Sequence, residues 1–391
     1  MRIAKRIGHI TQGRADGWEI YYRTRDMVAA GERVLNLTIG EHDIRTDPAI
    51  LKAMHDSAMA GNTGYAFGPG KPALREAIAA RAERLTGVPT SWRNVVVTPG
   101  GQAALFAAHM ALLDAGDRAL FCDPYYATYP GTIRATGAVA VPVPTRPEDA
   151  FAPAEAKIAA CAPGARTFLV NTPNNPTGTV YSRATLQGIA RAATLHDLWL
   201  ISDEVYDSQV WDGRHLSPRA LPGMAERTVV VGSMSKSHAM TGSRLGWVIA
   251  PEPVAEAITT LATNTTYGVP AFIQDAALYA LTLGAEFEAR IAEPFRRRRE
   301  IALVRLAGRN ALRAVPPQGA MYLMLDIRAT GLTGTAFAEA LLAEEGIAVM
   351  PGESFGAAAA GHVRVAMTIP DTAFDEAISR LAAFAERRAR G

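Results

Sequence analysis

Cysteine and long apolar runs are what this sequence of 391 residues has least of. Its two cysteines, Cys122 and Cys161, are too few for a disulfide framework, and no Cys/His cluster has the spacing of a metal site. No window approaches the ~18 consecutive apolar residues that a membrane-spanning helix needs. The basic N-terminus lacks the apolar core of a signal peptide. We therefore expect a cytoplasmic protein that holds no metal and has no membrane partner.

An excess of charge of one sign is also missing. Lys and Arg number 40 and Asp and Glu 38, which gives a formal net charge of +2. The basic residues are scattered, which argues against nucleic acid as a main partner. The densest basic run, residues 296–299, opens an amphipathic helical pattern. We interpret it as the solvated face of a helix rather than as a binding patch.

Short apolar runs alternate with helical stretches between about residues 94 and 250. Helical spacing is clear at 102–113 and 183–196, whereas the apolar runs are rich in β-branched residues or bounded by Gly, Pro, Asn and Asp. This alternation predicts an α/β fold with a mostly parallel sheet that is covered on both faces. The expected strands are 94–98, 118–122, 139–143, 166–170, 198–202, 228–232 and 246–250.

The pattern changes after about residue 290. A long helix is expected over 291–313, then a strand at 321–326, a helix at 335–345 and a last helix with apolar residues at helical spacing. We expect a smaller α+β domain here, since the length exceeds what one core fills. The predicted division is an N-terminal arm that returns to the small domain, a large domain and the small C-terminal domain: 1–45, 46–290 and 291–391.

Lys236 follows the apolar run TVVVG, so the expected strand would place it at the sheet edge where ligands of open α/β sheets bind. Ser233 and Ser235 flank its approach, and Arg244 follows in the same loop. Hydroxyls and a guanidinium near one lysine suit a phosphate monoester beside an amine-reactive carbonyl. Taken alone, these residues fit an ordinary surface lysine in a polar loop equally well.

Asp203 and Tyr206 follow the apolar run LWLIS in the same way. A carboxylate there could hold a proton on the pyridine nitrogen of pyridoxal phosphate (PLP), and a phenol could donate to the ring oxygen. By itself, an acidic pair after a strand is more often a turn or a helix cap.

Two loops continue this arrangement. NTPNNPTG follows a strand and places Asn175 where it could donate to the ring oxygen, although such a loop is a turn by default. TPGGQAAL runs from a strand through glycines into a helix, so backbone N–H groups of Gly101 and Gln102 could cradle a phosphate. A Gly-Gly pair before a helix is a weak signal alone.

Together, these motifs resemble the class I/II aminotransferases, PLP enzymes of fold type I, over nearly the whole chain. The resemblance implies a mostly parallel seven-stranded sheet in a large domain and a smaller α+β domain. It also implies ping-pong transfer of an amino group from an amino acid to a 2-oxo acid. The motifs that carry it are GYAFGPGKPALR, TPGGQAAL, DPYYATYP, NTPNNPTG, SDEVY, SMSKSHAMTGSRLG and VRVAMT.

The resemblance assigns roles around the cofactor. Lys236 is implied to form an imine (Schiff base) with PLP and then to move the substrate α-proton. Asp203 is implied to pair with the pyridine nitrogen, while Tyr206 and Asn175 contact the ring oxygen. The remaining contacts are a ring stacked on PLP and the residues around its phosphate: Tyr126, and Gly101, Gln102, Ser233, Ser235 and Arg244.

The resemblance also implies a substrate site and a partner. Arg364 would bind the substrate α-carboxylate, supported by Asn175 and the backbone at Gly40. Tyr65 would reach the phosphate of the neighbouring subunit, so a homodimer with shared active sites is expected. Two positions depart from the family pattern. Ser243 replaces a common Trp, and His42 stands where Pro is common. We interpret His42 as a loop residue rather than a catalytic base.

The amino donor is left open. One branch of aspartate aminotransferases uses a partner-subunit arginine for the distal carboxylate, and the corresponding stretch here, 261–274, contains no Arg or Lys. HDLWLISDEVY, SPRALPGMAERT, SKSHAMTG and YGVPAFIQDAA resemble the bacterial arginine–pyruvate transaminases. Asp16 and Glu19 could place negative charge near the entrance, although such acids are more often solvated caps. Arginine with pyruvate and an aspartate-like specificity both remain open.

Two other functions fit the same fold class. A PLP-dependent C–S β-lyase would release ammonia and pyruvate without an acceptor. A PLP-fold regulator that senses a ligand would carry an N-terminal helix-turn-helix domain, for which this chain has no room.

Overall fold

A seven-stranded sheet forms the centre of the computed structural model, which describes residues 3–11, 18–66 and 68–390. The strand order is β2-β8-β7-β6-β5-β3-β4, and every neighbouring pair is parallel except the two that involve β8. All seven strands lie where the sequence predicted them, and the mostly parallel α/β sheet is confirmed. Their bounds are β2 Val95–Thr98, β3 Arg118–Asp123, β4 Val139–Pro144, β5 Ala165–Asn171, β6 Trp199–Asp203, β7 Thr228–Ser233 and β8 Gly246–Ile249.

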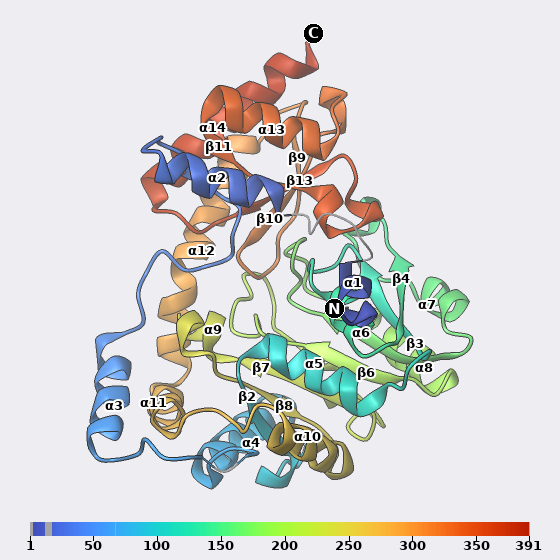
Figure 1. Ribbon diagram of the computed structural model, residues 1–391. Coiled ribbons are helices and arrows are strands. Elements are labelled where there is room, and N and C mark those ends of the chain that lie inside the picture. Colours follow the sequence, from blue (N-terminus) through green and yellow to red (C-terminus); the bar gives the residue numbers. More distant parts are fainter. Residues whose placement is uncertain (1–2, 12–17, 67, 391) are drawn as a thin grey trace.

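Helices cover both faces of this sheet (Figure 1). Side chains alternate along each strand, so Val96 packs with the helices of one face while Val95 and Val97 pack with those of the other. The first face carries α5 (Gly101–Leu112), α6 (Tyr129–Ala135) and α10 (Glu252–Asn264). The second carries α3 (Pro48–Met59), α4 (Pro72–Thr86), α7 (Glu155–Cys161), α8 (Arg183–Leu195) and α11 (Ala271–Thr282).

A second, antiparallel sheet lies in the upper part of Figure 1, with the order β12-β13-β10-β9. A separate parallel pair joins β1 near the N-terminus to β11, so the N-terminal segment returns to the C-terminal part of the chain. The division of the chain at residues 45 and 290 stays a prediction. The bounds are β1 Leu35–Asn36, β9 Arg313–Val315, β10 Tyr322–Asp326, β11 Ile347–Ala348, β12 Met350–Pro351, β13 His362–Ala366, α2 Glu19–Ala29, α13 Gly334–Glu345 and α14 Asp371–Ala389.

The long helix differs from its prediction. It was expected over 291–313, but α12 runs from Gly284 to Leu306, and residues 313–315 form strand β9. Its apolar face begins earlier because Phe287 packs under the large sheet, whereas Phe295 and Leu306 pack into the core of the small one. This helix therefore spans both cores, which a reading of the C-terminal pattern alone could not reveal.

The basic run on α12 is also not a solvated face throughout. Arg296 and Arg297 are half-exposed, but Arg298 is only 3% exposed. Its guanidinium is enclosed by carboxylates and a backbone oxygen from three other segments. The expectation of a solvated face was wrong for Arg298, because the helix turns that side chain between the two cores. It was also wrong for Arg299, whose side chain is 13% exposed and whose Nε donates to the Pro317 carbonyl oxygen over 2.7 Å.

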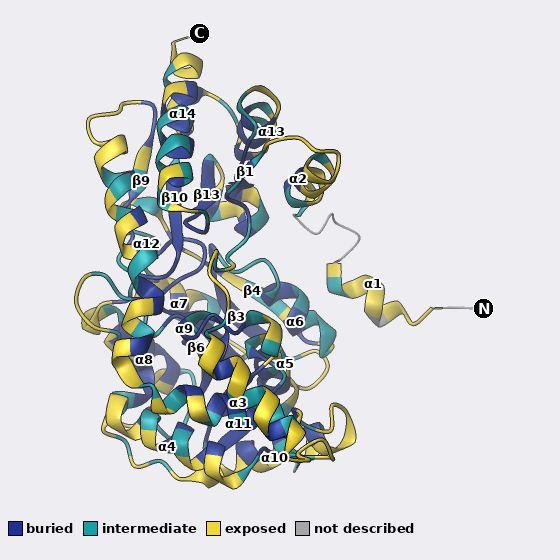
Figure 2. Cartoon of the chain, turned by 90° about the vertical axis from the view of Figure 1, so that its left-hand side faces the viewer, coloured by how far each residue is buried: buried dark blue, intermediate teal, exposed yellow. Residues whose placement is uncertain are grey.

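The N-terminal helix α1 (Lys5–Thr11) lies beside α6, where Arg134 Nε donates to the carbonyl oxygen of Ile10 over 2.8 Å (Figure 2). Figure 2 also shows that buried residues concentrate along the strands and on the inner sides of the helices. Among the residues that the structure describes, no helix is both long and apolar enough to cross a membrane.

Candidate active site

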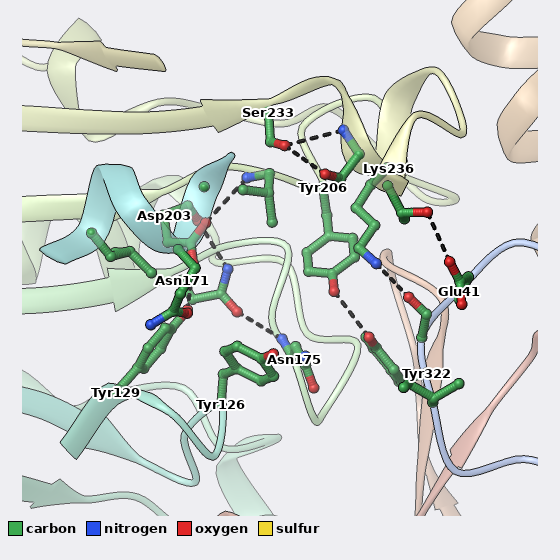
Figure 3. Close-up of a pocket in the computed structure, with 18 of the residues that line it drawn as sticks. Glu41, Tyr126, Tyr129, Asn171, Asn175, Asp203, Tyr206, Ser233, Lys236 and Tyr322 are labelled. Atoms are coloured by element: carbon green, nitrogen blue, oxygen red, sulfur yellow. Dashed lines mark hydrogen bonds between the residues drawn. The ribbon is translucent and has the colours of Figure 1, made fainter. Parts of the chain in front are cut away.

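Polar residues end three neighbouring strands of the large sheet. Asn171 ends β5, Asp203 ends β6 and Ser233 ends β7, so their side chains meet at one edge of the sheet, where open α/β folds bind ligands. They border a cavity of about 380 Å³ (Figure 3). Its walls also include Trp18, Ile39, Gly40, Glu41, Gly101, Gln102, Leu105, Tyr126, Tyr129, Asn175, Val205, Tyr206, Ser235, Lys236, Thr241, Arg244, Tyr322 and Arg364.

Lys236 lies on α9 (Met234–Ser237), a single turn that follows β7 and is capped by Ser233. Its Nζ donates to the carbonyl oxygen of Gly40, and its own carbonyl oxygen accepts from Gln209 Nε2 at 3.2 Å. Burial lowers the pKa of Lys236 to about 8, against the opposing charge of Glu41 and with help from two arginines. A neutral amine is therefore accessible near neutral pH.

Asp203 is buried at the end of β6, next to the strand β7 that leads to Lys236. The Tyr129 hydroxyl donates to Asp203 Oδ2 over 2.6 Å, and the Val205 backbone N–H approaches Oδ1 at 3.3 Å. Burial raises the pKa of Asp203 to about 6 despite these two donors, and the charge of Glu204 adds to the rise. A buried carboxylate of this kind is stabilised by a cation or by a protonated ring nitrogen.

Besides Tyr129, three tyrosines border the cavity, namely Tyr126, Tyr206 and Tyr322 (Figure 3). The hydroxyl groups of Tyr206 and Tyr322 are 3.0 Å apart, and burial raises the pKa of both phenols. Tyr126 also borders the cavity, and burial raises its pKa to about 12. All three phenols therefore stay protonated at neutral pH and can act as hydrogen-bond donors.

The N-terminus of α5 forms an anion cradle. Gly100 precedes this 12-residue helix with φ 84°, and a Cβ there would lie 2.5 Å from Arg244 Nη2. Ser233 and Ser235 stand on the same side, with their hydroxyls 2.9 Å apart. The Gln102 side chain instead turns to α6, where its Nε2 donates to Thr132 Oγ1 over 2.7 Å. Gln102 can therefore contribute its backbone N–H to an anion here.

Arg364 on β13 reaches the cavity from the small sheet and is 1% exposed. Its Nη1 donates to Asn175 Oδ1 over 3.0 Å and its Nη2 to the carbonyl oxygen of Thr38. The guanidinium lies 4.5 Å from the Tyr322 ring centre and 4.4 Å from that of Phe355. Within the described part of the chain no carboxylate pairs with it, and its Nε has no partner. Burying an unpaired cation is costly, so this geometry suits a bound carboxylate.

The structure thus brings the predicted residues into one cavity, with one exception. Tyr65 is 93% exposed and borders no part of it, lying instead against Tyr267 with ring centres 5.1 Å apart. Asp16 lies outside the described residues. Glu19 is exposed at the start of α2 and does not line the cavity. His42 lies in a loop and packs edge-on against Phe295, and burial lowers its pKa to about 4.

Sequence reasoning missed several wall residues. Tyr129 lies within the quoted motif DPYYATYP, but only the fold shows that its hydroxyl meets Asp203. Tyr322 lies within the strand expected at 321–326 and begins β10, and nothing in an apolar strand pattern distinguishes a phenol that faces a site. Asn171 ends a strand beside Asp203 and could have been found by that position. Trp18, Ile39 and Glu41 come from the N-terminal segment, whose approach to the sheet edge depends on β1 pairing with β11.

The sequence matches the family described as aminotransferase class I and II over residues 32–381. The chain belongs to this family. The arginine–pyruvate transaminase of Pseudomonas aeruginosa is 44% identical over 98% of each chain. The aspartate/prephenate aminotransferase of Thermus thermophilus is 37% identical over 90% of this chain and 91% of that one. The solved structure of the aspartate aminotransferase from Thermus thermophilus with maleate has a TM-score of 0.92 and 34% identity, and the match covers 98% of this chain and 100% of that one.

These matches confirm the predicted family, the type I fold and amino-group transfer as the activity. Enzymes of the family work with PLP. The cavity fits that cofactor on chemical grounds, since it combines an amine, a buried carboxylate, a helix N-terminus with an arginine, and phenols. Glycine is required where the backbone comes closest, because a Cβ on Gly40 would overlap the Tyr322 hydroxyl at 1.8 Å.

Proposed function

We propose that this aminotransferase uses PLP bound covalently by Lys236 and transfers an amino group from an amino acid to a 2-oxo acid by ping-pong kinetics. One observation carries the proposal. Among the described residues, a lysine amine of lowered pKa, a buried carboxylate and a guanidinium without a carboxylate partner face one cavity: Lys236, Asp203 and Arg364. PLP, when bound, supplies an electron sink next to the substrate α-carbon.

Lys236 is proposed to move the proton. Its pKa of about 8 leaves part of the amine neutral near neutral pH, so it can accept the α-proton of the substrate and return it. The Gly40 carbonyl oxygen accepts a hydrogen bond from Nζ and fixes where that amine points. Orientation matters because proton transfer requires the two heavy atoms to approach hydrogen-bond distance.

The other cavity residues are proposed to hold the cofactor. Asp203 would accept the hydrogen of the ring nitrogen, with Tyr129 fixing the carboxylate in place. Tyr206 and Asn175 would donate to the ring oxygen, and Tyr126 would stack on the ring face. The phosphate would be held by backbone N–H groups, two hydroxyls and one guanidinium: Gly101, Gln102, Ser233, Ser235 and Arg244.

Arg364 is proposed to bind the substrate α-carboxylate. Its fork is already oriented by Asn175 and by the backbone of Thr38, and two aromatic rings confine its plane. A planar guanidinium can hold a carboxylate through two parallel bonds, which also aims the α-carbon. Gly40 would complete this site through its backbone.

For the amino donor we propose a cationic or neutral side chain, with arginine first and pyruvate as acceptor. The cations that border the cavity among the described residues are Lys236, Arg244 and Arg364, and each has a proposed role. No cation is therefore left to bind a carboxylate on the side chain of the amino donor. Glu41 and Trp18 instead offer a carboxylate and an indole face, both of which suit a cationic side chain. The relative from Pseudomonas aeruginosa is named for arginine and pyruvate, although relatives named for aspartate are also similar.

A panel of amino donors tests this function. Arginine, lysine, alanine, leucine and aspartate are each supplied with pyruvate or 2-oxoglutarate, and both the new amino acid and the new 2-oxo acid are measured. Equal amounts of the two products from arginine and pyruvate support the proposal. Ammonia and pyruvate formed from a cysteine-like donor without acceptor would support a β-lyase instead. Aspartate as the preferred donor would overturn the charge argument.

The active unit is proposed to be a homodimer in which Tyr65 completes the partner's cofactor site. Tyr65 and Tyr267 are 93% and 58% exposed and pack against each other, so two aromatic rings face outward together. Exposed aromatic pairs of this kind mark contact surfaces. A location in the cytoplasm stays a prediction.

A further inference from the structure

One short segment, residues 37–43, contacts both ends of the proposed substrate site. The carbonyl oxygen of Gly40 accepts from Lys236 Nζ, and that of Thr38 accepts from Arg364 Nη2. Lys236 lies on α9, directly after β7 of the large sheet, and Arg364 lies on β13 of the small one. The position of this segment therefore relates the proton-transfer amine to the carboxylate-binding guanidinium.

The segment is attached to the small sheet on one side. The Ala366 N–H donates to the Leu37 carbonyl oxygen over 2.9 Å, and Thr368 Oγ1 donates to that of Ile39 over the same distance. These bonds fix its first half. Beyond Gly40 the chain turns into a loop that no strand pairs with, so side-chain contacts hold its second half. In one of them, Thr241 Oγ1 donates to Glu41 Oε1 over 2.8 Å.

The contact with the most hydrogen bonds there is an ion pair between Asp43 and Arg298. Arg298 Nη1 donates to Asp43 Oδ1 over 3.0 Å and Nη2 to Oδ2 over 2.7 Å, which is a two-bond, planar arrangement. Arg298 lies on α12, and the Asp43 side chain is 16% exposed. The same guanidinium donates to Asp371 Oδ1 over 2.8 Å and to the Met367 carbonyl oxygen over 3.0 Å. Such paired bonds restrict geometry as well as adding attraction.

We propose that Asp43 and Arg298 are positioning residues that set the spacing of Lys236 and Arg364 by anchoring residues 37–43. Only Glu41 and His42 separate Gly40 from Asp43, so a displacement of the backbone at Asp43 also displaces Gly40. The His42 ring, packed 5.2 Å from that of Phe295, adds a second contact with α12. Neither positioning residue borders the cavity, and the inference rests on the roles proposed for Lys236 and Arg364.

Asp371 provides a matched control. It bonds the same guanidinium from the start of α14 and contacts Arg297 as well, but it does not belong to residues 37–43. D43N and D371N each remove one negative charge from Arg298. If the ion pairs of Arg298 served only to stabilise the fold, D43N and D371N would change the same properties. Substrate binding would then weaken only to the extent that less protein is folded.

The experiment compares D43N, D371N and wild type as holoenzymes and as apoenzymes. In D43N we expect KM for the amino donor to rise about tenfold or more, with kcat changed far less, since an anchored carboxylate site is loosened by the loss of a charged bond. Hydrogen exchange of the backbone at residues 37–43 should quicken in the apoenzyme. D371N should leave KM within about twofold and that exchange unchanged.

A third measurement needs no catalysis. Competitive acetylation of apoenzyme across pH, mapped by mass spectrometry, gives the pKa of Lys236. The Gly40 carbonyl oxygen accepts a hydrogen bond from Lys236 Nζ and so stabilises the charged amine. If D43N weakens this hydrogen bond, the pKa of Lys236 should fall below its value of about 8 in D43N, whereas it should stay unchanged in D371N. If D43N yields no folded protein, R298K keeps the charge but loses the paired geometry and is expected to show the same changes.

Equal KM and equal Lys236 pKa in D43N, D371N and wild type would overturn the positioning role. So would a R298K enzyme with native KM. These outcomes are separable from failure of the proposed function, because loss of the Lys236 assignment would appear as PLP attached to another lysine. With PLP on Lys236 and no effect at Asp43, the anchoring inference alone is wrong.

Discussion

Tyr129 donates its phenolic hydrogen to Oδ2 of Asp203 over 2.6 Å, and both side chains are buried at the edge of the large sheet. This bond stabilises the charged carboxylate against the cost of burial, which still raises the pKa of Asp203 to about 6. The carboxylate that is proposed to hold the cofactor ring therefore depends on a phenol at the start of α6.

The variant Y129F removes that donor. The pKa of Asp203 should rise further, so PLP affinity should fall about tenfold, which corresponds to the loss of one hydrogen bond to a charged group. The loss should be larger at pH 6 than at pH 8.5, where the carboxyl is ionised in both proteins. Equilibrium PLP titration of apoenzyme at both pH values measures this.

Y181F is the matched control, since Tyr181 is equally buried but its hydroxyl contacts Cys122 Sγ at 3.7 Å, away from the cavity. It should leave PLP affinity and its pH dependence unchanged. If Y129F also binds PLP like wild type at pH 6, Tyr129 does not support Asp203.

Asp203 should also make the apoenzyme less stable than a D203N variant. Folding raises the pKa of Asp203 from 3.8 to about 6, so the folded state binds this proton more tightly than the unfolded chain does. Wild-type stability should therefore decline as pH rises through this range, and D203N should lack the decline.

Above pH 7 the free energies of unfolding of D203N and wild type should differ by at most about 3 kcal/mol, because a pKa difference of one unit corresponds to about 1.4 kcal/mol. Urea unfolding of both apoenzymes at pH 4.5 and pH 7.5 measures it. D203N should nevertheless lose nearly all transaminase activity, since an amide cannot hold the ring nitrogen protonated. Retained turnover would contradict the role of Asp203.

R364K should keep the fold and its PLP content but bind the amino donor poorly. Lysine keeps the charge but cannot make two parallel bonds to a carboxylate, and it loses the planar contacts with Tyr322 and Phe355. We expect KM to rise by about 30-fold or more, which corresponds to roughly 2 kcal/mol. R328K, which alters a half-exposed arginine paired with Asp326, is the control and should leave KM unchanged. A native KM in R364K would show that the carboxylate binds elsewhere.

Mixed dimers test the shared site. K236A and Y65A are each expected to be inactive or strongly impaired, for different reasons. In a K236A/Y65A hybrid, one of the two sites would hold both native residues, so activity should return when the two proteins are mixed under conditions that allow exchange. Exchange is followed independently with differently tagged subunits. Hybrids that form without regaining activity would remove Tyr65 from the partner's site.

Much of this fold is predictable because strand position follows from local pattern. The runs 95–98 and 228–233 are buried and rich in β-branched residues. The second ends at Ser233, which borders the cavity. Residues at or just after strand ends, such as Asp203 on β6 and Lys236 after β7, are consequently located by sequence alone. Their meeting at one edge is a property of parallel strands.

Long-range pairing is what the sequence does not reveal. The apolar face of α12 serves two cores, so its bounds and the burial of Arg298 depend on which segments meet there. Tyr129 and Tyr322 read as ordinary aromatic residues until the fold turns their hydroxyls toward Asp203 and Tyr206. Polar atoms inside such a site form hydrogen bonds with residues that are far apart in the chain, and the hydrophobic periodicity of the sequence does not indicate which residues these are.

Reductive trapping of the cofactor on one lysine tests the central claim most directly. Borohydride converts the covalent link between PLP and its lysine into a stable amine, which survives digestion and is located by mass spectrometry. The other lysines of the chain are Lys5, Lys52, Lys71 and Lys157, so the peptide that carries the label is unambiguous. The account predicts the pyridoxyl group on Lys236 and its absence from K236A. Label on any other lysine, or K236A with native turnover, would contradict it.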